Sequence, residues 1–251
     1  MFNAIRISFV AFVLTPIVLM NGLELGGNFP VILALVSGAF AVYASIQIFF
    51  YTLKRSQAHV TTTVGNSSPV WAVILAIFIL GEEITVTLPL SMVLVVAGSF
   101  LLMPRSRGPS NWKLAVPLAT IVAVLWGFDQ VLRKWCISLA MGSITFLWVS
   151  LVSASLLLGL SALAKKSWSG QHFSRRNVGL ALASGVSGQL IGTYLYICSI
   201  TFENVSAIAP ITTAAVPFGF LMSILMVQEK PNLKSWIGMI LVFSGVLLAA
   251  L

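Results

Sequence analysis

Long apolar runs separated by short polar segments fill almost the whole chain. A helix needs about 20 apolar residues to cross a hydrocarbon layer of ~30 Å. Runs of this kind occur near residues 6–21, 30–52, 60–80, 86–103, 113–133, 142–164, 177–200, 205–227 and 235–251. They lack the ten-residue alternation of transmembrane barrel strands. The pattern predicts an all-α integral membrane protein of about nine transmembrane helices.

Composition points to the same environment. Hydrophobic residues make up 59% of the 251 residues and charged residues 8%, with a mean hydropathy of +1.03. Soluble domains carry roughly 25% charged residues, so the apolar surplus must face a lipid bilayer. The net charge of +8 does not form a basic patch of the kind that binds nucleic acid. The basic residues stand singly or in pairs between the apolar runs instead.

The basic residues predict the topology. Twelve of the 14 Lys and Arg residues fall on one side of the expected spans, and Arg133 and Lys134 fall on the other. The positive-inside rule makes the first side cytoplasmic. We therefore expect a multi-pass protein of a cytoplasmic-type cell membrane, with its N-terminus inside and its C-terminus outside. The twelve are Arg6, Lys54, Arg55, Arg105, Arg107, Lys113, Lys165, Lys166, Arg175, Arg176, Lys230 and Lys234.

The chain contains an internal repeat. One gapless offset of 147 aligns residues 35–101 with 182–248 and pairs Glu82 with Glu229 and Gly98 with Gly245. Each glutamate precedes the last helix of its half, where a carboxylate is favoured by the helix dipole. We interpret both glutamates as architectural. The repeat predicts an N-terminal part at 1–104 and a C-terminal part at 112–251.

The two parts differ in helix number and in charge. Four spans precede residue 112 and five follow it, so span 113–133 has no partner; its counterpart would lie before Met1. Either that first helix is missing from this chain or the protein evolved without it. The repeat mate of Lys54 and Arg55, the segment TFEN at 201–204, has no Lys or Arg, whereas the segment QEKPNLK carries two lysines that GEEITV lacks. The halves therefore favour opposite orientations, as in transporters built from inverted repeats.

These segments resemble the EamA-like branch of the drug/metabolite transporter superfamily. The resemblance is carried by SSPVWAVILAIFILGEE, by TTAAVPFGFLMSILMVQEK, and by LATIVAVLWGFDQVLRK with its Trp126-Gly127 pair. It covers nearly the whole chain. It implies a fold of ten helices in two five-helix inverted repeats and the movement of metabolites, amino acids, sugars or nucleotide sugars. This chain departs from it by lacking the first helix.

The second span has a polar face and a face of small residues. Tyr43, Gln47 and Tyr51 lie four residues apart on one side, and a small-residue stripe runs along the other. We expect the small stripe to pack against another helix and the polar face to line the solute pathway. An interfacial tyrosine with one interhelical hydrogen bond is the alternative. The small stripe consists of Ser37, Ala41 and Ser45 and recurs as Ser184, Gly188 and Gly192.

Two other spans carry polar residues beside proline. Asn66 and its neighbouring Ser and Thr residues precede Pro69, and Thr213 precedes Pro217 at the corresponding place in the second half. Interrupted helices at matching positions of two repeats are a sequence pointer to a binding site. A kink closed by Ser and Thr hydroxyls, without a ligand, is the alternative.

Asp129 is the acidic residue that falls inside an expected span. Its carboxylate would serve proton coupling or bind a cationic solute group; an ion pair with Arg133, one helical turn away, is the alternative. Our candidate substrate-binding residues are Tyr43, Gln47, Tyr51, Asn66, Trp126, Asp129, Gln189, Tyr194 and Thr213.

A secondary carrier for a small polar metabolite, such as an amino acid, or for a drug explains these features best. A membrane-embedded enzyme and a non-transporting helical bundle are the alternatives. We expect no enzymatic activity, because neither the two histidines nor the six acidic residues form a catalytic set. We also expect no cofactor, metal or nucleic-acid partner. The bilayer and a small-molecule substrate are the expected partners, and homo-oligomer formation and proton coupling stay open.

Overall fold

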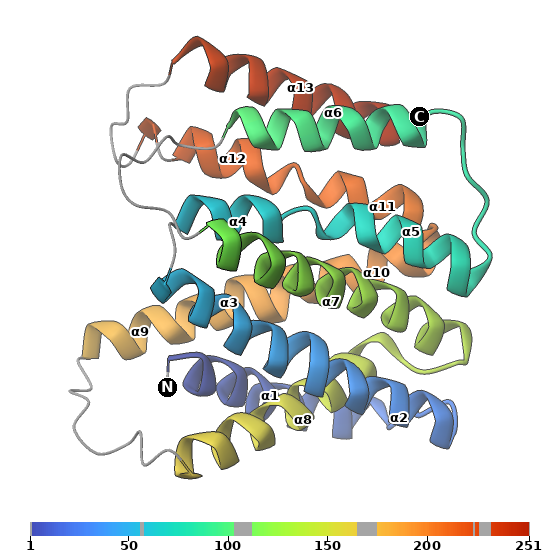
Figure 1. Ribbon diagram of the computed structural model, residues 1–251. Coiled ribbons are helices and arrows are strands. Elements are labelled where there is room, and N and C mark those ends of the chain that lie inside the picture. The colour runs from blue at the N-terminus through green and yellow to red at the C-terminus, as the bar shows by residue number, and fades with distance from the viewer. Residues whose placement is uncertain are drawn as a thin grey trace. The chain divides into compact units, whose positions relative to one another are not determined.

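The computed structural model describes residues 2–55, 58–102, 112–164, 175–222, 224–225 and 232–250. All regular elements in these ranges are helices (Figure 1). Seven are long and apolar enough to cross a membrane, and two shorter apolar helices, Leu88–Leu101 and Leu233–Ala249, accompany them. The expectation of an all-α membrane protein with about nine spans is confirmed.

The first half of the chain contains four helical segments. The first is α1 (Phe2–Asn21) and the last is α6 (Leu88–Leu101). The second is a continuous rod with π-helix at its centre, formed by α2 (Asn28–Ser37), η1 (Gly38–Ala44) and α3 (Ser45–Arg55), and the third is a broken helix formed by α4 (Ala58–Gly65) and α5 (Ser68–Leu80). The label η marks π-helix, a wider helical turn that is often found at functional sites.

The second half repeats this order after one additional helix. It contains α7 (Trp112–Ser138), α8 (Ser143–Ala164), the rod α9 (Arg175–Ser184), η2 (Gly185–Gly192) and α10 (Thr193–Phe202), the broken pair α11 (Val205–Thr212) and α12 (Ala215–Met222), and α13 (Leu233–Ala249). An offset of 147 carries 28–55 onto 175–202 and carries the start of η1 onto the start of η2. The helix α7 has no counterpart among the described residues.

The chain forms two compact units, and each unit contains elements of both halves. The first unit comprises Met1–Ala44 and Leu132–Phe202, and the second comprises Ser45–Val131 and Glu203–Leu251. The boundary at Ala44 coincides with the end of η1. In the first unit α1 packs on α8, its counterpart in the repeat. In the second unit α6 packs on α13 and α5 packs on α11.

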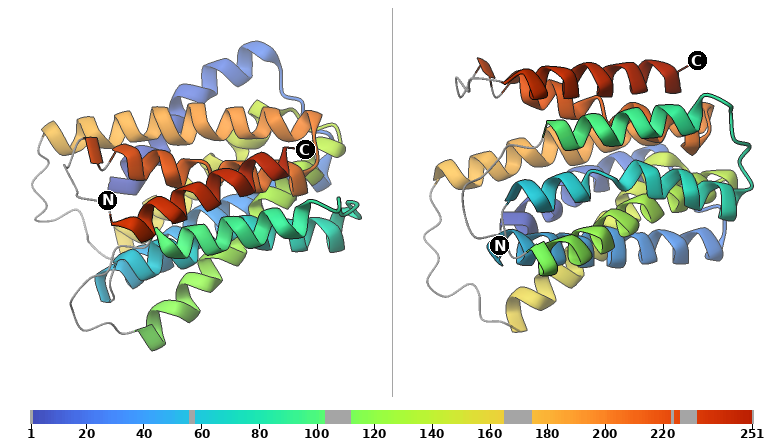
Figure 2. Two further views of the ribbon diagram at one scale, coloured as in Figure 1. Left: turned by 90° about the horizontal axis from the view of Figure 1, so that it is seen from above. Right: turned by 45° about the horizontal axis from the view of Figure 1, so that its top comes forward.

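The contact between α6 and α13 is a close approach of two backbones (Figure 2). A Cβ atom added to Gly98 would lie 2.6 Å from the carbonyl oxygen of Gly238, and one added to Gly245 would lie 2.8 Å from the carbonyl oxygen of Ser91. The Ser91 hydroxyl also donates a 2.8 Å hydrogen bond to the Gly245 carbonyl. Small residues let membrane helices approach this closely.

Each of the two long rods also contacts a neighbouring helix through a glycine. In the first unit, a Cβ atom on Gly38 would overlap the carbonyl oxygen of Ser150 on α8. At the matching position, a Cβ atom on Gly185 would lie 2.9 Å from Cγ of Arg6 on α1. Each π-helix therefore begins where its backbone meets a neighbouring helix.

Candidate functional site: a polar pocket at two helix breaks

The first helix break separates α4 from α5. Asn66 and Ser67 form the turn, and the peptide N–H of Asn66 donates to the Thr62 carbonyl at 2.8 Å. The Ser67 hydroxyl donates to the carbonyl of Val64 at 2.7 Å. Pro69 follows within the first turn of α5, where its missing N–H costs nothing. The break is thus closed by local hydrogen bonds.

The second break separates α11 from α12 and has the same construction. Thr213 and Ala214 form the turn, with the peptide N–H of Ala214 donating to the Ile211 carbonyl at 3.0 Å. The hydroxyls of Thr212 and Thr213 donate to the carbonyls of Ala209 and Pro210. Ser and Thr hydroxyls therefore bond to backbone carbonyls at both breaks, as the alternative without a ligand also requires.

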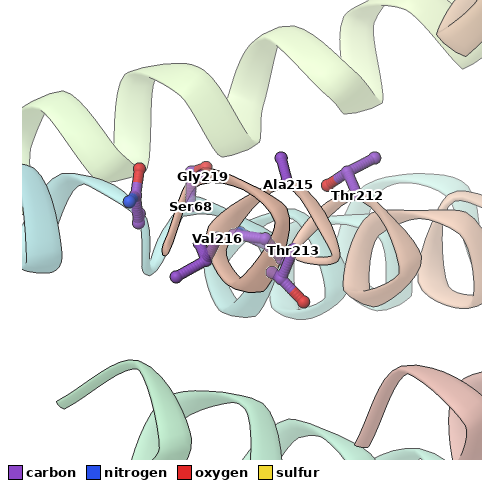
Figure 3. Close-up of a pocket in the computed structure, with 8 residues that line it drawn as sticks. Ser68, Thr212, Thr213, Ala215, Val216 and Gly219 are labelled. Carbon is purple, nitrogen blue, oxygen red and sulfur yellow. The ribbon is translucent and has the colours of Figure 1, made fainter. Parts of the chain in front are cut away.

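The two breaks border a single pocket of about 380 Å³ within the second unit, a volume in the range of small-molecule sites. Its first wall includes Asn66 and Ser68, and the offset of 147 carries these onto Thr213 and Ala215 of the second wall. Figure 3 shows Thr212 and Ala215 projecting to one side of the α11–α12 segment. The lining consists of Asn66, Ser68, Pro69, Thr212, Thr213, Ala215, Val216 and Gly219.

The polar groups of the two walls differ in their availability. The Asn66 amide and the Ser68 hydroxyl have no hydrogen-bond partner in the part of the chain that the structure describes. The hydroxyl protons of Thr212 and Thr213 are used by backbone carbonyls, so these oxygens offer their lone pairs as acceptors. Asn66 is exposed and offers both a donor and an acceptor.

The two faces of the second predicted span differ in burial, as the spacing of their residues suggests. The small stripe is buried, with Ser37 and Ser45 at 0% exposure. Tyr43 and Gln47 are half-buried, and Tyr51 is exposed with the Arg55 guanidinium 4.5 Å above its ring. Tyr43, Gln47 and Tyr51 do not line the cavities found beside α4, α5, α6, α11 and α12.

The second small stripe does not pack as the sequence suggested. Gly188 and Gly192 are exposed, and a Cβ atom on Gly188 would meet nothing within 4 Å. Ser45 of the first stripe contacts α7, since the Trp126 indole N–H donates a 2.9 Å hydrogen bond to the Ser45 hydroxyl. At the equivalent Gly192, the nearest atom to an added Cβ is the Ser187 carbonyl oxygen of the same helical segment, at 3.3 Å.

The surroundings of α5 and α12 also differ. Gly127 of α7 sits so close to Ser68, Trp71 and Ala72 of α5 that a Cβ atom would lie within 2.9 Å of each. The equivalent residues of the second half include Ala215 and Gly219, which are exposed, and a Cβ atom on Gly219 would meet nothing within 4 Å.

Trp126 and Asp129 occupy crowded positions on α7. The Trp126 ring packs at a tilt of 45° against Phe49 with centroids 5.4 Å apart, so its contacts are those of a packing residue. Asp129 is 5% exposed. The ion pair of Asp129 with Arg133 stays a prediction, and the Arg133 guanidinium lies 5.7 Å from the ring centroid of Tyr196.

The remaining candidates belong to the first unit. Gln189 lies in η2 and Tyr194 in α10, and both side chains are half-buried. Lys134 donates a 2.6 Å hydrogen bond to the carbonyl of Ile200 near the end of α10. A binding role of Gln189 and Tyr194 remains a prediction.

Sequence reasoning misplaced the contact of Glu82. We expected its carboxylate at the start of its own half's last helix, but α6 begins only at Leu88. Both carboxylate oxygens instead accept hydrogen bonds from the first amides of α11, in the other half. The repeat mate Glu229 lies outside the described residues.

A larger cavity of about 570 Å³ lies between α5 and α6. Its described lining is entirely apolar, so it offers no group that would orient a polar solute. At the equivalent place in the second half, Phe220 and Trp236 pack edge to face, 6.2 Å apart. The pocket at the breaks is therefore the better candidate for a polar solute.

The sequence profile of the EamA-like transporter family matches residues 1–103 and 113–251, which is one match for each half. The chain belongs to the EamA-like transporter family. Members of this family are membrane transporters of small molecules, so the protein is a multi-pass membrane protein of a transporter family. The family assignment agrees with the internal repeat, whose two halves both contribute residues to the pocket.

Comparison with solved structures supports the same fold. A chain titled "Crystal structure of protein" superimposes with a TM-score of 0.82 at 16% sequence identity. The alignment covers 99% of this chain and 85% of that one. At this identity the likeness shows the fold alone. No curated protein sequence matches the chain.

Proposed function

We propose that the protein is a secondary carrier that moves a small polar solute, such as an amino acid, across a cytoplasmic-type cell membrane. We further propose that the solute binds in the pocket between the two helix breaks. The observation that carries this proposal is the position of the pocket, since equivalent interruptions of both repeats border it. Carriers of inverted-repeat design hold their solutes at such interruptions.

The lining chemistry supports a neutral, hydrogen-bonding mode of recognition. Asn66 and Ser68 offer groups without a partner in the described chain, and Thr212 and Thr213 offer acceptor lone pairs. Pro69 and Val216 add apolar surface. A small solute with hydroxyl, amide or amino groups matches this set.

The decisive experiment is uptake by the purified protein in liposomes. We expect saturable flux of at least one solute from a panel of radiolabelled amino acids and other small polar metabolites. Asn66→Leu keeps the side chain's size and removes its hydrogen-bonding groups, which lowers kcat/KM about tenfold for the loss of roughly 1.4 kcal/mol.

Asn177→Leu is the matched control, because Asn177 is an exposed asparagine on α9. It should transport like the wild type. Flux that is unaffected by Asn66→Leu would remove the pocket from the mechanism. Absence of flux for every solute, in protein that remains folded, would favour a non-transporting bundle.

A further inference from the structure

Glu82 of the first half holds a helix of the second half. Its Oε1 atom accepts a hydrogen bond from the Val205 amide at 2.9 Å, and Oε2 accepts one from the Ser206 amide at 2.8 Å. Glu82 lies in the segment between α5 and α6, so the contact joins residues 123 and 124 positions apart in the chain. One carboxylate thus caps the N-terminus of α11.

No group within α11 replaces this cap. Asn204 occupies the N-cap position, but its side chain makes no capping hydrogen bond. Val205 and Ser206 are 0% and 4% exposed, so water has little access to their amides. A buried amide without a partner costs about 1–3 kcal/mol, and a carboxylate is the favoured partner at a helix N-terminus.

The Glu82 cap and the pocket lie at opposite ends of one short helix. The helix α11 has eight residues, which makes it about 12 Å long. Glu82 holds its first turn, and Thr212 and Thr213 at its other end line the pocket. Pro210 removes one amide donor from the last turn. A helix this short is marginal in isolation, so its placement depends on its contacts with the rest of the unit, which include α5, α6 and α13.

We propose that Glu82 is a positioning residue for the solute pocket: it sets the placement of α11, and thereby the distance between the walls at Asn66 and at Thr212. This proposal rests on the proposed function for its effect on transport. Its structural part stands on the hydrogen bonds of Glu82 alone.

Thiol labelling tests the structural part directly. In a background in which Cys136 and Cys198, the two cysteines of the chain, are replaced by alanine, Thr212→Cys reports on the second wall and Asn66→Cys reports on the first. Both parent residues are exposed. The rate of reaction with a soluble maleimide is measured with and without Glu82→Gln.

We expect Glu82→Gln to change the rate at Thr212→Cys at least threefold and to leave the rate at Asn66→Cys unchanged. The glutamine keeps the length of the side chain but turns an NH₂ group toward one of the two amide donors. Glu83→Gln is the matched control, because Glu83 is the exposed neighbour, and it should change neither rate.

Two outcomes would overturn the proposal. The first is an unchanged rate at both reporters. The second is an equal change at both, which indicates general loosening of the unit. Glu82→Asp, whose carboxylate is one methylene too short for both amides, should reproduce the selective change if Glu82→Gln does not yield folded protein.

Uptake provides the functional readout. Glu82→Gln should raise KM severalfold more than Glu83→Gln does, because the misplaced wall weakens solute binding. If Asn66→Leu has no effect on uptake, the proposed function fails, while the labelling rates still decide whether Glu82 positions α11. The two failures are therefore distinguishable.

Discussion

At the scale of single residues, the glycines divide into those that touch another backbone and those that face open space. Gly38 belongs to the first group, since a Cβ atom there would overlap the Ser150 carbonyl and lie 2.8 Å from Cβ of Ser153. Gly159, on the same helix α8 as these serines, belongs to the second group because nothing lies within 4 Å of its Cβ position.

Gly38→Ala should therefore destabilise the protein by about 1–3 kcal/mol, the usual cost of overpacking a tight contact. Gly159→Ala should leave stability within about 0.5 kcal/mol of the wild type. Chemical or thermal unfolding in detergent, followed by circular dichroism, measures both. Equal unfolding midpoints for the two variants would show that the Gly38 contact is not tight in solution.

Gln47 allows a test of the polar face of the second span. If this face lines the solute pathway, Gln47→Leu should raise KM for the transported solute severalfold, because a hydrogen-bonding group is lost without a change in size. Ile46→Leu, at a half-buried neighbour on α3, serves as the control. Unchanged uptake kinetics of Gln47→Leu for every solute would refute the lining role.

Residue types predicted the site only in part. Asn66 and Thr213 were found because proline and a run of hydroxyl residues mark a helix break locally. Trp126 proved to be bound to Ser45, 81 positions away, and Glu82 to α11. Such pairings depend on which helices become neighbours, and the sequence of one helix does not contain that information.

At the scale of elements, α6 and α13 are equivalent helices of the two halves, and they meet through equivalent residues. The offset of 147 carries Gly98 onto Gly245 and Ser91 onto Gly238. The approach of Gly98 to Gly238 thus becomes the approach of Gly245 to Ser91. A two-fold axis between the two helices is the simplest geometry that pairs them in this way.

This symmetry predicts that equivalent glycine substitutions lower the free energy of unfolding by similar amounts. Gly98→Ala and Gly245→Ala should each destabilise the protein by about 1–3 kcal/mol, with similar values because they disturb equivalent contacts. Gly219→Ala should be close to neutral, since its Cβ position is open. Unfolding midpoints in detergent compare the three variants, and a neutral result for only one member of the pair would contradict the symmetric contact.

Hydrophobic runs predicted the elements well but not their internal form. The expected span at 30–52 corresponds to the rod at 28–55, and the expected span at 177–200 corresponds to the rod at 175–202. The π-helical segments η1 and η2 left no trace in the apolar pattern. They begin at Gly38 and Gly185, which lie in close contact with a neighbouring helix, and composition alone does not reveal such contacts.

At the scale of the whole molecule, the repeat predicts on which faces of the membrane the helix ends lie. Lys54 is the next-to-last residue of one long rod and Thr201 is the next-to-last residue of its repeat mate, and both residues are exposed. Inverted repeats place such equivalent ends on opposite faces of the membrane. The excess of Lys and Arg predicts that the Lys54 face is cytoplasmic.

A membrane-impermeant maleimide added to intact cells should therefore label Thr201→Cys in a cysteine-free background and should label Lys54→Cys only after permeabilisation. The identical chemistry of the two sites makes each the control for the other. Labelling of both from the same side would exclude the inverted arrangement.

The contacts of α7 have a thermodynamic consequence if the proposed function holds. In a carrier made of inverted repeats, the inward-open and outward-open states arise when the two halves exchange conformations, and identical halves would give states of equal free energy. Gly127 of α7 packs closely on α5, whereas a Cβ atom on Gly188 or Gly219 would meet nothing within 4 Å among the described residues. For the proposed carrier we therefore expect the two states to be unequally populated in the absence of solute.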